Sequence, residues 1–255
     1  MSLPFEGAYT PSQLRRWLDA MSRRFSCRQF SQPADSAQLA TLAYAAQRVS
    51  LKGIRIALVK EGGENLVVSL PFFPRFEGLQ QYAVLYAKEG TDLPAFRAGI
   101  SGQALALEMA AQGLQSCWMT GNYRRAQAME QAQEGEKPLA VMPFGWPRDP
   151  EGARLSRRRI LTAFSTDDPT QWPYWAYRAA EAMRSAPSAM NRQPWQLSYA
   201  GSTLSFTGSR LDSVDTGIAL LHLECALGGY PRAWRLAGDG RTLLARLLED
   251  TREPV

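Results

Sequence analysis

Histidine and cysteine are scarce in this chain. His222 is the only histidine, which excludes a metal site built from several histidines and argues against a Ser-His-Asp triad. Cys27, Cys117 and Cys225 are widely spaced and form no CxxC pair. An odd number of dispersed cysteines is typical of reduced thiols rather than of a disulfide framework or a zinc site. We therefore expect no bound metal.

Long apolar runs are also missing. No stretch approaches the roughly 20 apolar residues that a membrane-spanning helix needs. Residues 1–10 have no basic stretch before an apolar run and contain Glu6, unlike a signal peptide. We therefore expect a cytoplasmic protein with no membrane partner.

Lysine is rare, so arginine supplies most of the net charge of +5. One interpretation is an arginine-rich proteome with solvated faces, and another is nucleic-acid binding. The arginines are scattered, with no basic arm or recognisable nucleic-acid module, so we expect no nucleic-acid partner. A third interpretation is local. Residues 23–28 (RRFSCR) and 157–159 (RRR) could together hold one phosphate, because guanidinium groups bind it through bidentate, charge-assisted hydrogen bonds.

Helical and strand patterns alternate along the chain, which favours an α/β or α+β layered fold. Predicted helices cover residues 10–21, 36–48, 93–114, 173–185 and 212–227, and predicted strands cover residues 54–59, 82–87, 116–119, 139–144, 195–199 and 203–207.

The chain also shows weak self-similarity. Residues 43–59 align loosely with residues 182–199 in pattern, and each lies in a helix–loop–strand unit. The polar loop at residues 147–154 is the best candidate junction. We therefore predict a first half at residues 1–150 and a shorter second half at residues 151–255.

The most informative segment is residues 186–195, APSAMNRQPW. Its prolines restrict the backbone, and Ser188, Asn191 and Gln193 offer hydrogen bonds at close spacing. From the residues alone, the segment is either a rigid turn that places Trp195 in the core or a stiff polar loop suited to the edge of a planar heterocycle.

This segment resembles the APSxxNxQPW loop of the FMN-dependent nitroreductase family and keeps every fixed position. Residues 24–30 (RFSCRQF) resemble that family's RxSxRxF motif, residues 99–118 its GxAxxxLxLAAxxLGLGSxW helix and residues 141–147 its xxPxGYP strand. Together these motifs span most of the chain. The resemblance implies an α+β, nitroreductase-like layered fold, with FMN as cofactor and NAD(P)H as electron donor.

The order of the motifs departs from that of ordinary family members, which are homodimers with FMN at the interface. In those proteins APSxxNxQPW follows RxSxRxF within one helix–loop unit. Here that place, residues 48–55, reads RVSLKGIR, and the intact loop lies far downstream. The resemblance thus implies two pseudo-symmetric halves in one chain, as in the single-chain thermotogal branch. Such a fused pseudo-dimer would bind one FMN at its seam and can itself be monomeric.

The resemblance also assigns residues to the first side of this site. Arg24 and Ser26 are expected to hold the FMN phosphate, with Arg157 and Arg159 adding charge; the alternative for these arginines is an exposed basic stretch. Arg28 is expected near N1 and O2 of the flavin, where a cation stabilises the reduced form.

Other residues are expected to contact the flavin ring. Thr120 and Gly121 would approach it with backbone groups, and Pro187, Ser188 and Asn191 would contact it from the second half.

Three further features have simpler interpretations. His222 is expected to be a neutral, hydrogen-bonded interior residue. No role is assigned to Cys27, although Arg28 beside it could lower its pKa. The aromatic residues Phe72, Phe73 and Phe76 are expected in the core rather than in a substrate wall.

The expected function is an oxidoreductase that passes hydride from NAD(P)H through FMN to a small electron-poor acceptor such as a nitroaromatic or quinone. No catalytic side chain is required, because the flavin supplies the chemistry. The alternative is a non-catalytic flavin- or ligand-binding protein on the same fold, and a remoter one is a basic nucleic-acid-binding protein.

Overall fold

The computed structural model describes residues 3–68, 75–150 and 157–248. The helices are α1 (Pro11–Met21), α2 (Ser36–Val49), α3 (Pro94–Ala111), α4 (Arg125–Met129), α5 (Tyr174–Arg184) and α6 (Val214–Leu227). The strands are β1 (Phe30–Gln32), β2 (Ile54–Val59), β3 (Gln81–Lys88), β4 (Gln115–Ser116), β5 (Glu136–Pro147), β6 (Trp195–Ala200), β7 (Thr203–Gly208), β8 (Arg232–Leu236) and β9 (Thr242–Leu247).

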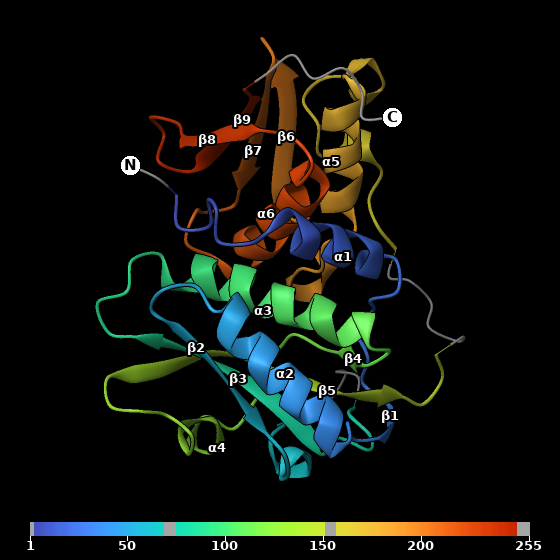
Figure 1. Ribbon diagram of the computed structural model, residues 1–255, viewed down its shortest axis with the longest axis vertical. Coiled ribbons are helices and arrows are strands. Elements are labelled where there is room, and N and C mark those ends of the chain that lie inside the picture. Colours follow the sequence, from blue (N-terminus) through green and yellow to red (C-terminus); the bar gives the residue numbers. More distant parts are fainter. Residues whose placement is uncertain (1–2, 69–74, 151–156, 249–255) are drawn as a thin grey trace.

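Two antiparallel sheets lie at opposite ends of the molecule, with α1, α3 and α6 between them (Figure 1). The first sheet has the order β1-β5-β3-β2, with β4 also paired to β5, and the second has the order β6-β7-β9-β8. Sheets of antiparallel strands packed with helices confirm the α+β class. Parts of two predicted features, Glu151–Gly152 of the junction and Phe72–Phe73, lie outside the described residues.

The same arrangement of elements occurs twice. Along the chain, α2-β2-β3-α3-β4-β5, with α4 inserted between β4 and β5, is followed by α5-β6-β7-α6-β8-β9. The pairing order β2-β3-β5-β4 in the first sheet has its counterpart in β6-β7-β9-β8 in the second. The self-similarity seen in the sequence therefore corresponds to a repeated topology.

Local sequence signals place most of these elements. Thr10 caps α1 in a capping box with Gln13, and Pro11 occupies the first helical position, where it has no N–H to leave unsatisfied. The strand predicted at residues 54–59 pairs in register with the one predicted at residues 82–87. The predictions omitted β1, α4, β8 and β9.

Helices α3 and α6 cross at a pair of glycines. A methyl group at Gly99 would clash with the carbonyl oxygen of Val214, and one at Gly217 would clash with that of Phe96. In each case the clashing carbonyl belongs to the opposite helix and lies about one turn before the glycine of that helix. The contact is therefore nearly symmetric. Only residues without a side chain allow two helix backbones to approach so closely.

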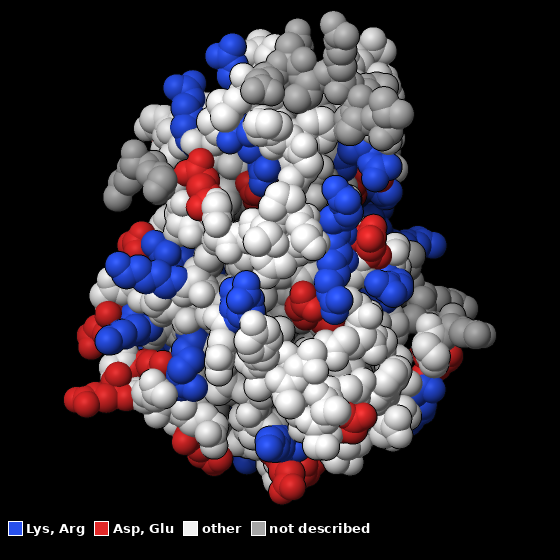
Figure 2. All heavy atoms as spheres, in the orientation of Figure 1, with Lys and Arg blue, Asp and Glu red and all other residues white. Residues whose placement is uncertain are grey.

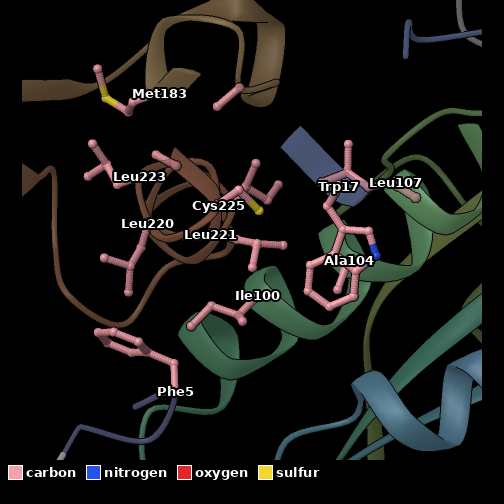
Figure 3. Close-up of a cluster of buried hydrophobic side chains, with 14 of the residues drawn as sticks. Phe5, Trp17, Ile100, Ala104, Leu107, Met183, Leu220, Leu221, Leu223 and Cys225 are labelled. Carbon is pink, nitrogen blue, oxygen red and sulfur yellow. The ribbon is translucent and has the colours of Figure 1, made fainter. Parts of the chain in front are cut away.

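One hydrophobic core joins the two sheets. It runs from Leu85 of β3 through the central helices to Phe206 of β7. Figure 3 shows part of it, where Ile100 of α3 and Leu221 of α6 lie in one cluster with Trp17 of α1. The two sheets are therefore packed around one shared core. Among the described residues, no helix has both the length and the apolar character to cross a membrane.

Candidate functional site

Arg24 is a buried cation just after α1. Its side chain is only 5% exposed, and its Nε has no hydrogen-bond partner within the described part of the chain. Burial, assisted by the positive charge of Arg158, lowers the pKa of Arg24 to about 10. An uncompensated buried charge is costly, so this position favours an anion as partner.

The segment that follows Arg24 is fixed against the end of β4. Ser26 forms a parallel bridge with Ser116, and the N–H of Cys27 donates to the Ser116 carbonyl at 3.1 Å. Ser26 and Arg28 are half-buried. The RxSxRxF residues therefore have a defined backbone position beside the first sheet.

The positive charges of Arg24 and Arg28 both act on the buried thiol of Cys117. Burial raises the pKa of this thiol, whereas the positive charges of Arg28 and Arg24 lower it. Beyond Cys117 the chain becomes exposed at Thr120 and Gly121, and a Cβ at Gly121 would meet no atom within 4 Å. Open space therefore lies next to this part of the first half.

The loop after α5 has an unusual backbone. Met190, Asn191 and Gln193 have φ values of 52°, 54° and 50°. Left-handed conformations are uncommon for residues other than glycine, and such strain persists only where the surroundings impose it. The loop between α5 and β6 is therefore held in one demanding shape.

Several hydrogen bonds hold that shape. The Ser188 hydroxyl accepts from the Gln193 N–H at 2.8 Å, and the Gln193 side-chain carbonyl accepts from the Arg159 N–H at 3.1 Å. The Asp215 carboxylate, at the start of α6, accepts from the Ala189 N–H at 3.0 Å. Burial raises the pKa of Asp215, although the hydrogen bond from Ala189 opposes this shift. Sequence reasoning did not identify Asp215 as an anchor of this loop.

Asn191 joins the loop to the arginine cluster at residues 157–159. Its Nδ2 donates to the Arg157 carbonyl at 2.6 Å, and its Oδ1 accepts from the Arg158 guanidinium. Arg158 also donates to the Ser185 carbonyl at 3.1 Å. Pro187, between Ser185 and this contact, is buried.

The middle arginine of the cluster, Arg158, is half-buried, and its charge acts on Arg24. Arg157 is exposed and contributes its carbonyl to the site, while the Arg159 guanidinium donates to the Ala163 carbonyl. Sequence reasoning identified residues 157–159 as a candidate phosphate cluster but assigned the site to Arg157 and Arg159 rather than to Arg158. In a run of three identical residues, no sequence signal distinguishes the one that points inward.

A buried chain of hydrogen bonds crosses the seam beneath the site. Trp118 Nε1 donates to Gln103 Oε1 at 3.0 Å, and Gln103 Nε2 lies 2.9 Å from His222 Nε2. His222 Nδ1 lies 2.9 Å from the Ala182 carbonyl. An indole N–H only donates, so Gln103 presents its oxygen to Trp118 and its NH2 to His222. His222 therefore accepts at Nε2 and donates at Nδ1 to Ala182.

These hydrogen bonds connect the segment after β4 with α5, the helix that precedes the strained loop. Trp118 follows β4, Gln103 belongs to α3, and His222 belongs to α6. Complete burial lowers the pKa of His222 to about 3, so the ring is neutral. The prediction of a neutral, hydrogen-bonded interior histidine is confirmed.

The residues at the seam fit a flavin mononucleotide. The Nε of buried Arg24, unpartnered among the described residues, suits a phosphate, and half-buried Ser26 supplies a hydroxyl two residues further along the chain. The strained loop offers polar groups suited to the edge of a heterocycle. Within residues 3–68, 75–150 and 157–248, no group of three or more His, Cys, Asp or Glu residues is arranged to hold a metal ion.

Comparison with known proteins agrees with this geometry. The family model described as "Putative TM nitroreductase" matches residues 17–227. The crystal structure of a protein described as a putative nitroreductase from Thermotoga maritima is 23% identical, with a TM-score of 0.61. That match covers 91% of this chain and 93% of the other, and it shows the fold. No curated protein sequence matches this chain.

Two further solved structures match mainly over one part of the chain. A nitroreductase family protein from Streptococcus pneumoniae is 12% identical, with a TM-score of 0.48, over 60% of this chain and all of its own. An FMN and NADPH-dependent nitroreductase from Sphigopyxis sp. strain HMH is 17% identical, with a TM-score of 0.45, over 60% of this chain and 97% of its own. On the match to residues 17–227, the chain belongs to the family described as "Putative TM nitroreductase".

Proposed function

We propose that this chain binds one FMN at the seam and passes hydride from NAD(P)H to a small electron-poor acceptor, such as a nitroaromatic or quinone. The observation that carries the proposal is Arg24, a buried guanidinium whose Nε has no partner among the described residues and whose pKa is lowered by the charge of Arg158. Two cations drawn together from distant parts of the chain are stabilised by a bound phosphate.

In this proposal Arg24 and Ser26 bind the phosphate, and Arg158 adds charge from the opposite side. Arg157 and Arg159 act through their backbone: the Arg157 carbonyl orients Asn191, and the Arg159 N–H holds Gln193. These contacts support a role for the whole run at residues 157–159.

The ring is bound by Pro187, Ser188 and Asn191 of the strained loop and by the backbone at residues 120–121. Arg28 lies on the same side as Arg24, where its charge favours a reduced, negatively charged ligand. When bound, FMN supplies the hydride chemistry, and the protein contributes position and electrostatics.

We further propose that residues 1–150 and 151–255 form the two halves of a fused pseudo-dimer, which can be monomeric. The repeated topology and the near-symmetric glycine contact support this. Only one flavin is proposed per chain, because the connection between α2 and β2 is just residues 50–53, whereas that between α5 and β6 is residues 185–194. The connection at residues 50–53 is too short to form a second loop like the one proposed to bind the flavin ring.

A small-molecule acceptor is proposed in preference to a nucleic acid. On the face shown in Figure 2, basic side chains are spread over the surface and acidic side chains lie among them. This distribution lacks the continuous basic stripe that follows a phosphate backbone.

The test is the absorption spectrum of the purified protein, followed by turnover. One flavin per chain of a monomeric protein is expected, together with NADH or NADPH oxidation that depends on a nitroaromatic or quinone. Flavin binding without turnover would favour the non-catalytic alternative. A protein that binds no FMN after reconstitution would contradict the proposal.

A further inference from the structure

A hollow lies behind the strained loop, at one corner of the second sheet. Its volume is about 360 Å³, and it lies where β6 begins, β7 ends and β9 begins. It is lined by Arg159, Ala163, Arg192, Gln193, Pro194, Trp195, Gln196, Thr207, Gly208, Ser209 and Arg241. The proposed flavin site does not use this space, although both sites share the loop.

The charged residues that line this hollow are all positive within the described part of the chain, although the charge of Arg192 also acts on the Asp215 carboxylate. Arg159, Arg192 and Arg241 line it, and no carboxylate does. The guanidinium of Arg159 donates to a backbone carbonyl, and that of Arg192 lies 3.7 Å from the sulfur of Met190. Neither contact neutralises a positive charge.

Arg241 has a weak acidic neighbour that performs a different task. Its Nε lies 3.9 Å from Asp239, beyond hydrogen-bond distance. The Asp239 carboxylate instead accepts from the N–H groups of Arg241 at 3.0 Å and Thr242 at 2.9 Å, and from the Thr242 hydroxyl at 2.6 Å. Asp239 therefore fixes the turn that carries Arg241 and leaves its guanidinium available.

Trp195 lines the hollow and carries a buried donor that is unsatisfied among the described residues. It is only 3% exposed, yet its Nε1 has no hydrogen-bond partner in the part of the chain that the structure describes. A buried indole N–H normally donates to an acceptor. An anion with several oxygens would be bound by the surrounding arginines.

We propose that this hollow binds the phosphate group of a second ligand. Three guanidinium groups from separate segments surround a space large enough for a phosphate and part of the molecule that carries it. The 2′-phosphate of NADPH and a free phosphorylated molecule share this chemistry. Assigning it to NADPH rests on the proposed function, whereas phosphate binding does not.

The experiment is a calorimetric titration of the FMN-loaded protein with sodium pyrophosphate at low ionic strength. Loading the protein first keeps the Arg24 site occupied. We expect saturable binding that Arg192→Ala or Arg241→Ala weakens about tenfold or more, the usual effect of losing a charge-assisted hydrogen bond. Arg246→Ala is the matched control, because Arg246 is exposed on β9, the strand that begins just after Arg241, and does not line the hollow. Flavin content should be unchanged in all three variants.

Parallel titrations with NADP⁺ and NAD⁺ identify the source of the phosphate. Tighter binding of NADP⁺ that is lost in the two variants assigns the hollow to the 2′-phosphate. Equal binding of the dinucleotides, with pyrophosphate still bound, assigns it to another phosphorylated molecule. Undetectable pyrophosphate binding, or binding that neither variant weakens, overturns the proposal. If the protein takes up no FMN, the same pyrophosphate titration on the flavin-free chain still tests the hollow.

Discussion

The carboxylate of Asp212 accepts a hydrogen bond from the backbone N–H of Phe96 at 3.0 Å, so a residue just before α6 caps α3. Helix α3 needs this partner because its own N-cap residue, Leu93, provides no side-chain hydrogen bond and adopts a left-handed backbone. A carboxylate at a helix N-terminus also interacts favourably with the helix dipole.

Replacement of Asp212 should therefore destabilise the whole molecule. We expect Asp212→Ala to lower the free energy of unfolding by about 1 kcal/mol, the typical cost of a lost N-cap. Asp212→Asn keeps an acceptor and should cost less. Urea unfolding measures both, with exposed Asp19→Ala as the control. Equal stability of Asp212→Ala and the unmodified protein would show that the cap contributes nothing.

A substitution at the glycine contact between α3 and α6 should destabilise the protein more than loss of the Asp212 cap. A methyl group at position 217 must push the two helix backbones apart, so Gly217→Ala should cost about 1 to 3 kcal/mol, as overpacking usually does. Gly229→Ala is a suitable control, because no atom lies within 4 Å of a Cβ there. If both variants unfold at the same urea concentration, the helices do not approach as closely as described.

Replacing Arg24 should weaken FMN binding but stabilise the FMN-free protein. Arg24→Met should weaken FMN binding by about 1.5 to 3 kcal/mol, the range for a hydrogen bond to a charged group. Without FMN the same variant should be more stable than the unmodified protein, because a buried charge without a partner has been removed.

Fluorescence titration with FMN and thermal unfolding with and without FMN measure these two effects. The melting temperature of Arg24→Met should also respond less to added FMN. The neighbouring Arg23→Ala serves as the control, since Arg23 is exposed. A variant that binds FMN normally would remove Arg24 from the site.

The lowered pKa of His222 predicts how the stability of the folded protein depends on pH. Its pKa is about 3 in the folded protein and ordinarily near 6.5 in an unfolded chain. Between these values the unfolded state binds a proton that the folded state does not. Stability should therefore be fully present above about pH 6.5 and decrease as the pH falls toward 3, by up to about 1.4 kcal/mol per pH unit.

The variant His222→Gln separates this effect from other titrations. Carboxylates such as Asp239, whose pKa is lowered to about 2 by its hydrogen bonds, also lose stabilising interactions in acid. Urea unfolding from pH 4 to 7 should give a shallower slope for His222→Gln than for the unmodified protein. Parallel curves would show that the histidine titrates normally in the folded state.

Local sequence signals predicted the elements with strong caps or patterns. The Thr10–Pro11 start of α1 and the hairpin formed by β6 and β7 depend on neighbouring residues and were confirmed. Strands β8 and β9 were missed because Arg232, Arg235 and Arg246 interrupt their apolar pattern. These strands are stabilised by pairing with each other and with β7, which no local window contains.

The candidate site was predictable only in part, for the same reason. The motifs identified the segments around Arg24 and Asn191, but which arginine of residues 157–159 points inward depends on tertiary packing. The chain from Trp118 through Gln103 to His222 joins residues far apart in sequence. Its components look like ordinary core residues until the helices are placed side by side.

The contact at Gly99 and Gly217 also bears on how this protein can evolve. In an assembly of two identical chains, a mutation at such an axis changes both sides at once, and both changes must be tolerated together. Here the two glycines are encoded separately, so either helix can diverge alone. Ala104 follows Gly99 in α3 at the same spacing at which His222 follows Gly217 in α6, so the two helices already differ at equivalent positions. One polypeptide can therefore specialise its two sides, with binding groups on one and packing groups on the other.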